Sequence, residues 1–117
     1  MNRNSAEGQI EGGCVYNSMW PILEDMKWRN GITLANSFHT YLIPTSADVP
    51  DIETIVVESG GGLGPYGAKG IGEPSDNSIA PAVVNAIRDA IGTGLNLNKM
   101  PITPEKILNA IRGKAME

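Results

Sequence analysis

Cysteine, histidine and phenylalanine are almost absent: the 117-residue chain has one of each, Cys14, His39 and Phe38. One cysteine excludes an internal disulfide framework and a cluster held by four cysteines of this chain. One histidine excludes a zinc site with paired histidines, and we expect no metal ligand here. Lysine and arginine number 9 against 13 acidic residues, which argues against a nucleic-acid or anionic-membrane partner. No apolar run approaches the roughly 18 residues that span a bilayer. The expectation is a cytoplasmic chain with a single domain, 1–117.

Glycine, by contrast, is in excess, and the excess is local. Seven of the 14 glycines lie between Gly60 and Gly72. Glycine costs more backbone entropy to order than any other residue, so such a run is either a linker or a loop that must pass close to something. Linkers of this kind are serine-rich and lack large apolar groups, whereas this run contains Leu63 and Tyr66. An ordered loop is favoured.

The apolar pattern predicts helices packed on a small sheet. A helical stripe covers residues 8–26, and Pro21 interrupts it, which indicates a kink or two shorter helices. Asn30-Gly31 is a turn signal between short strands. Two more strands are predicted around 38–43 and 52–57. Two capped helices follow, one that begins at Ser78 and is closed by Gly92 and Gly94, and one from Thr103 to Gly113. The class is α/β (α+β).

Two phosphate-binding motifs are incomplete. The spacing Gly62-x-Gly64-x-x-Gly67 matches a dinucleotide fingerprint, but Pro65 and further glycines prevent the helix that it needs. Gly67-Ala-Lys69-Gly70 lacks the serine or threonine of a P-loop. Nucleotide binding by this loop is therefore the weakest of the three functional hypotheses for this chain.

Glu73 ends the glycine run and precedes Pro74. Proline biases the preceding residue towards extended geometry, so Glu73 is expected in an extended backbone at the exit of a loop with room for a bulky ligand. A carboxylate in a confined site is a candidate general base, because burial tunes its pKa. The alternatives are a glutamate that caps the following helix and one that is merely solvated.

Two segments together resemble the molybdenum-binding subunit of the xanthine dehydrogenase and aldehyde oxidase family. They are Gly8-Gln9-Ile10-Glu11-Gly12-Gly13 and Gly64-Pro65-Tyr66-Gly67-Ala68-Lys69-Gly70-Ile71-Gly72-Glu73-Pro74. Tyr41-Leu-Ile-Pro44-Thr45, Ala80-Pro81-Ala82 and Thr103-Pro104-Glu105 resemble the same family in the same order. The ordered set covers nearly the whole chain, which is identified as similar to the C-terminal portion of the family's molybdopterin-binding domain.

The resemblance implies that Glu73 is the catalytic base and that Gln9 hydrogen-bonds the pterin of the molybdenum cofactor. It implies an oxidoreductase that hydroxylates a carbon of an N-heterocycle or aldehyde with oxygen from water. The cofactor that the resemblance implies is molybdopterin or its cytosine dinucleotide, with iron–sulfur clusters and FAD on other domains or subunits. The expected partners are those subunits and the remainder of the molybdenum subunit.

Under this interpretation the chain is a fragment or split subunit that is inactive alone. The rival hypothesis is a truncated, non-catalytic domain that acts only in association. Its exposed apolar surface would favour a homo-oligomer when isolated.

Overall fold

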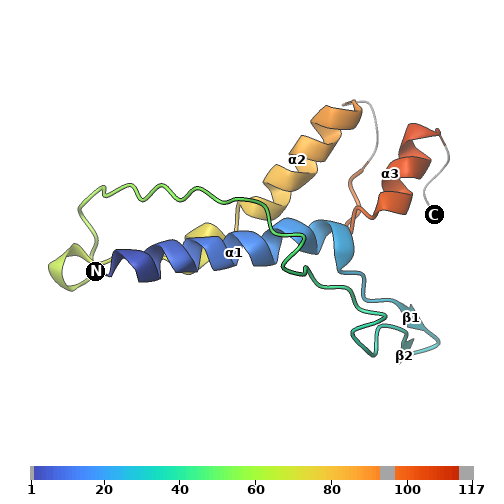
Figure 1. Cartoon of the computed structure of the whole chain (residues 1–117), viewed down its shortest axis with the longest axis horizontal. Helices are drawn as coiled ribbons and strands as arrows, with labels where there is room; N and C mark the ends of the chain where they lie inside the picture. The colour runs from blue at the N-terminus through green and yellow to red at the C-terminus, as the bar shows by residue number, and fades with distance from the viewer. Residues whose placement is uncertain (1, 93–96, 114–117) are drawn as a thin grey trace.

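The computed structural model describes residues 2–92 and 97–113. Helix α1 runs along the longest axis, α2 and α3 stand on one side of it, and a small hairpin lies near its C-terminal end (Figure 1). In chain order the elements are α1 (Arg3–Leu23), β1 (Trp28–Arg29), β2 (Ile32–Thr33), the 3₁₀ turns η1 (Pro65–Gly67) and η2 (Glu73–Ser75), α2 (Ile79–Ile91) and α3 (Pro104–Ile111). The α+β prediction is confirmed.

Helix α1 begins earlier than the apolar stripe indicates, because Asn2 caps it through a bond that its side chain accepts from the Ser5 N–H. Two separate helices, one of the alternatives for Pro21, are not formed. Pro21 lies in the last turn of a single helix, where its missing N–H removes only one backbone bond. Its carbonyl accepts a bond from the Ile102 N–H at 2.6 Å. The proline therefore lies where the end of α1 meets the C-terminal segment.

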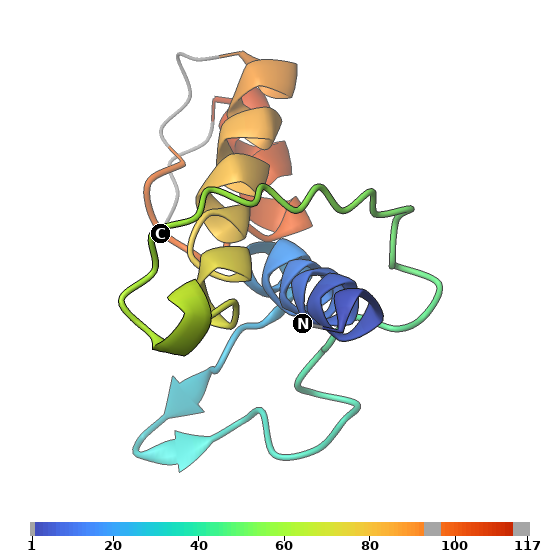
Figure 2. The same cartoon turned by 90° about the vertical axis from the view of Figure 1, so that its left-hand side faces the viewer.

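The predicted hairpin is present, with Trp28 opposite Thr33 and Arg29 opposite Ile32. The two further predicted strands, at 38–43 and 52–57, are wrong for this chain: residues 34–64 contain no strand. A strand needs a partner for its backbone groups, and no segment of the described chain lies in position to supply one. Residues 50–59 instead run as an extended trace past α1 (Figures 1 and 2).

The C-terminal helices hold the main apolar core. Leu97, Ile102 and Ala110 are buried, and the apolar side chains packed on them are Val84, Ile87, Ile91 and Ile107. Both predicted helices of this region are confirmed. Thr103 caps α3 by accepting a bond from the Lys106 N–H, while Ser78 precedes α2 without a side-chain cap bond. Gly94, a second stop signal after α2, lies outside the described residues.

The chain is more open than a compact domain of its length. Its radius of gyration is 17.9 Å, against roughly 13 Å for a compact domain of this size. Large apolar side chains remain exposed along the whole described chain, and the most exposed are Phe38, Val57, Leu63 and Tyr66. Much apolar surface is therefore available to a partner. No helix in residues 2–92 or 97–113 is long and apolar enough to cross a membrane.

Candidate functional site

One face of α1 supports the segment that carries Glu73. Gly13, buried in the middle of the helix, lies against Ser75 and Asp76 at the end of η2. A Cβ at position 13 would lie 2.9 Å from the Ser75 Cβ and closer to its hydroxyl, well inside ordinary contact distance. The two backbones thus meet at a separation that only glycine permits at this position.

Ser75 then fixes the turn that precedes it. Its side chain is 7% exposed, and its hydroxyl donates a 2.8 Å bond to the Gly72 carbonyl. The Glu73 carbonyl accepts bonds from the N–H groups of Asp76 and Asn77. Residues 72–77 therefore form a hydrogen-bonded unit held on α1 through Gly13.

Glu73 opens the 3₁₀ turn η2, so the expectation of an extended backbone at this residue is wrong. The turn is compatible with Pro74 because proline is well suited to the first positions of a helix, where its missing N–H costs no bond. The Glu73 side chain is exposed, and its carboxylate takes part in no hydrogen bond or ion pair within residues 2–92 and 97–113. It does not cap α2.

Gln9 and the end of the glycine loop line one pocket. It has a volume of about 360 Å³ and is lined by Asn2, Ser5, Ala6, Gln9, Ile71 and Gly72. Gln9 precedes Gly13 by one helical turn, so both lie on the same side of α1. The structure thus brings one predicted site residue, Gln9, beside the residue that precedes the other, Glu73.

The pocket offers groups suited to an organic cofactor with hydrogen-bonding edges. The side chains of Asn2, Ser5 and Gln9 supply amide and hydroxyl donors and acceptors. A Cβ on Gly70 or Gly72 would meet nothing within 4 Å, so the loop leaves space on this side. The volume is near the lower end of the roughly 300–1,000 Å³ typical of ligand pockets. The described residues therefore form a small pocket lined largely by polar side chains and glycine.

The glycine loop folds back on itself before it reaches this pocket. A Cβ on Gly62 or Gly64 would lie 2.7 Å from the Ala68 carbonyl oxygen, and Lys69 donates a 2.6 Å bond to the Ser59 hydroxyl across the base of the loop. The loop contains a 3₁₀ turn, with no strand before it and no α-helix opening within it. The structural context that a dinucleotide fingerprint requires is therefore missing.

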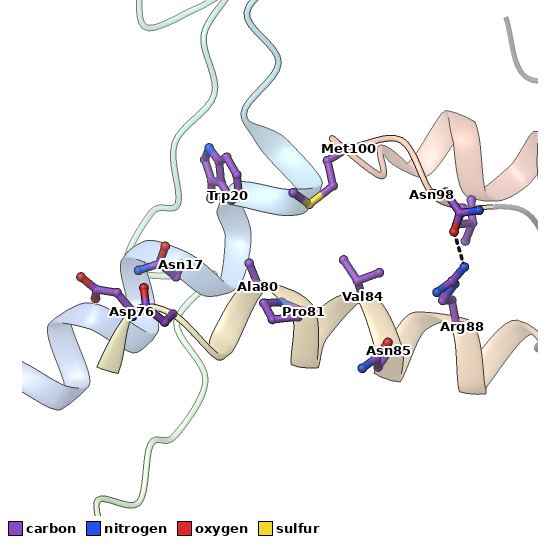
Figure 3. A pocket seen from close by; sticks show the side chains of 12 residues that line it. Asn17, Trp20, Asp76, Ala80, Pro81, Val84, Asn85, Arg88, Asn98 and Met100 are labelled. Atoms are coloured by element: carbon purple, nitrogen blue, oxygen red, sulfur yellow. Dashed lines mark hydrogen bonds between the residues drawn. The ribbon is translucent and has the colours of Figure 1, made fainter. Parts of the chain in front are cut away.

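A larger pocket of about 560 Å³ lies farther along α1, between that helix, the start of α2 and the segment at 97–100 (Figure 3). Asn17 and Trp20 come from α1, and Arg88 donates a hydrogen bond to Asn98 at its far end. This pocket contains neither Gln9 nor Glu73. It lies beyond the Gly13–Ser75 contact, so the two pockets are separate.

Sequence reasoning missed Asn2, Ser5 and Ser75. Ser5 and Gln9 are four residues apart on a helix, so the helical spacing alone would have placed Ser5 beside Gln9. Ser75 had no signal of its own in the sequence. His39 is exposed and lies in neither pocket, and Cys14 is half-buried. The described residues contain no group of three or more side chains placed to hold a metal ion.

Comparison with known proteins gives a consistent result. The family profile described as the molybdopterin cofactor-binding domain matches residues 1–50. A probable xanthine dehydrogenase subunit of Bacillus subtilis (strain 168) is 38% identical over 110 residues, which cover 94% of this chain and 14% of that protein. This confirms the resemblance to the molybdenum-binding subunits of the xanthine dehydrogenase and aldehyde oxidase family. The homologues of this chain are molybdenum hydroxylase subunits.

A solved structure extends the similarity to the molybdenum hydroxylase fold. Quinoline 2-oxidoreductase from Pseudomonas putida 86 superposes with a TM-score of 0.89 at 36% identity, over 97% of this chain and 15% of that one. The putative xanthine dehydrogenase molybdenum-binding subunit of Escherichia coli (strain K12) is 33% identical over 109 residues. The chain spans 14% of the length of this relative and of the B. subtilis relative.

Proposed function

We propose that this chain is the C-terminal portion of the molybdopterin-binding domain of a molybdenum hydroxylase, as a fragment or a separately encoded subunit. The observation that carries the proposal is the pocket shared by Gln9 and Gly72, with Glu73 next along the chain. The proposed reaction is hydroxylation of a carbon of an N-heterocycle or aldehyde with oxygen from water. Two relatives named for xanthine and quinoline support the heterocycle.

In this proposal Gln9 binds the pterin through its side-chain amide, which offers two N–H donors and one carbonyl acceptor. Asn2 and Ser5 lie on the same pocket wall and supply further hydrogen bonds. The molybdenum–pterin cofactor, as molybdopterin or its cytosine dinucleotide, supplies the two-electron oxidation of the substrate. Iron–sulfur clusters and FAD would lie on other subunits or domains.

Glu73 is the proposed general base. Its carboxylate oxygen accepts the proton of the water-derived hydroxyl that is transferred to the substrate. The Glu73 carboxylate makes no hydrogen bond or ion pair with the described residues, so its oxygens are open to the hydroxyl whose proton a general base removes. The Gly13–Ser75 contact and the Ser75–Gly72 bond hold the backbone at Glu73 in place, which is what a positioned base requires.

The first test is the native mass and molybdenum content of the complex that contains this chain in its own cells. A molybdenum-containing complex well above 100 kDa is expected, since the chain spans 14% of its relatives. A small, metal-free species would contradict the proposal and support the associating, non-catalytic domain instead.

The second test is Glu73→Gln in the assembled enzyme. Loss of a positioned base should lower kcat by about 10² to 10⁴-fold while molybdenum stays bound. Glu11→Gln is the matched control, because it removes the same charge from an exposed residue of α1 and should leave kcat unchanged. Activity of the Glu73→Gln enzyme above a few per cent would refute the assignment.

A further inference from the structure

Residues 52–57 have the composition of a β-strand but no strand beside them. The run reads Ile-Glu-Thr-Ile-Val-Val, rich in the β-branched residues that favour strands, and its six residues match a typical strand length. In both views it is extended and no strand runs beside it (Figures 1 and 2).

The backbone of this segment has no hydrogen-bond partner among residues 2–92 and 97–113. No backbone hydrogen bond of the described residues involves a residue from 49 to 63. A row of unpaired N–H and C=O groups on an extended segment is a template for another strand.

The side chains alternate in exposure as they do on a half-covered strand. Ile55 and Val57 are 76% and 81% exposed, whereas Ile52, Thr54 and Val56 on the opposite face are less exposed. A free surface segment has no reason to carry exposed isoleucine and valine at every second position. Residues 52–57 therefore have an apolar face as well as a backbone edge without a partner.

The extended path is shared with a much larger protein. Residues 35–64 make up about a quarter of the chain, so a TM-score of 0.89 over 97% of the chain requires most of them to superpose on quinoline 2-oxidoreductase. This chain corresponds to 15% of that protein. In quinoline 2-oxidoreductase, the extended path of these residues therefore occurs within a protein that contains much more polypeptide than this chain.

We propose that residues 52–57 form a strand of a sheet whose neighbouring strand belongs to the remainder of the molybdenum-binding subunit. This inference rests on the proposed function, because it takes that remainder as the partner. The partner strand is apolar on the face beside Ile55 and Val57 and carries no acidic residue opposite Glu53 or Glu58.

A second copy of the chain fits this edge poorly. In the antiparallel register that pairs the apolar run 54–57 with itself, Glu53 of one copy lies opposite Glu58 of the other. Like charges directly opposite each other destabilise a strand pair.

Hydrogen–deuterium exchange tests the pairing directly, in the purified native complex and in the isolated chain. In the complex, alternate amides among residues 52–57 should exchange at least about 100-fold more slowly than in the isolated chain, because ladder N–H groups are protected. A complex that contains molybdenum but shows no slowing at 52–57 would overturn the strand while the proposed function stands. Failure to find any molybdenum complex would overturn both. Slow amide exchange at residues 52–57 in the isolated chain, together with a dimeric mass, would overturn the proposal and identify a second copy of the chain as the partner.

Proline variants give an independent readout in the same complex. Successive N–H groups of a strand point to opposite edges, so Ile55→Pro and Val56→Pro each remove the donor on one edge. At least one of them should lower the fraction of chain recovered in the complex about tenfold, whereas Ile55→Val and Val56→Ile should not. Far-UV circular dichroism of the isolated variants should be unchanged, because the segment bonds to nothing there. Normal assembly of both proline variants would refute the proposal.

Discussion

Gly13→Ala tests whether the contact between α1 and η2 positions Glu73. The new Cβ would lie 2.5 Å from the Asp76 carboxylate oxygen and 2.9 Å from the Ser75 Cβ. The carboxylate can rotate away, but the Ser75 Cβ is fixed to the backbone, so η2 must move by about half an ångström or more to reach ordinary contact distance.

The free energy can be estimated from three opposing effects. Alanine is favoured over glycine inside a helix by about 1 kcal/mol. Overpacking typically costs about 1–3 kcal/mol, and disturbing the buried Ser75–Gly72 hydrogen bond costs about 1 kcal/mol more. The net expectation is a destabilisation of about 1–3 kcal/mol.

Gly12→Ala is the matched control, because a Cβ there meets nothing within 4 Å. It should raise the stability of the isolated chain by about 1 kcal/mol through helix propensity alone. Thermal unfolding of the two variants, followed by helical circular dichroism, should therefore shift in opposite directions. In the assembled enzyme, Gly13→Ala should also lower kcat by up to about 10²-fold, as expected for a base displaced by a fraction of an ångström to an ångström.

The reasoning is refuted if Gly13→Ala is as stable and as active as the parent. It is also refuted if both alanine variants destabilise the isolated chain equally, since helix geometry rather than the η2 contact would then be responsible. Coupling provides a further check: Gly13→Ala should cost less in a Ser75→Ala background, where the hydroxyl nearest the new methyl group is gone.

Three further predictions concern the cofactor, the loop and a surface turn. Gln9→Leu should lower the pterin content of the purified complex several-fold without changing its mass, whereas equal cofactor content would remove Gln9 from the site. Gly62→Ala should impair assembly or activity, because its Cβ would clash with loop carbonyl oxygens. Gly70→Ala is the control: its Cβ would meet open space, so NMR spectra of the isolated chain should show an unchanged fold. The Thr45 hydroxyl and N–H donate hydrogen bonds to the Asp48 carboxylate and lower its pKa from the ordinary 3.8. The turn is therefore stabilised above pH 3.8 and loses this stabilisation as the pH falls through the lowered pKa of Asp48. Thr45→Val removes the hydroxyl bond and should raise the pKa of Asp48 in an NMR titration.

The helices could be predicted because their signals are local. Thr103 and Pro104 specify the start of α3, and Asn30-Gly31 specifies the hairpin turn, where both residues adopt positive φ. Each signal acts within a few residues and does not depend on the rest of the protein.

The segment at 52–57 shows the opposite case. Its composition favours a strand, but a strand exists only with a neighbour, and none of the described segments provides one, so the prediction is wrong for this chain. The conformation of Glu73 failed for a related reason: the bias from Pro74 towards extended backbone was outweighed by the bonds that Asp76 and Asn77 donate to the Glu73 carbonyl. Tertiary contacts on Gly13 hold that turn, and a local rule cannot include them.

The glycine excess can now be divided by physical cause. Gly13, Gly62 and Gly64 are required by close approach within the chain itself, where any Cβ would clash. Gly8, Gly12, Gly70 and Gly72 have no such reason, since a side chain at any of them would meet nothing of this chain within 4 Å. Glycine inside a helix costs about 1 kcal/mol relative to alanine, and Gly8 and Gly12 carry that cost on α1 with no contact to offset it. Gly72 lines the pocket of Gln9 and Gly8 adjoins Gln9 in the chain. Gly72 and Gly8 therefore lie beside the proposed cofactor site, so it is the cofactor-loaded complex, and not the isolated chain, in which alanine at these two positions should be harmful.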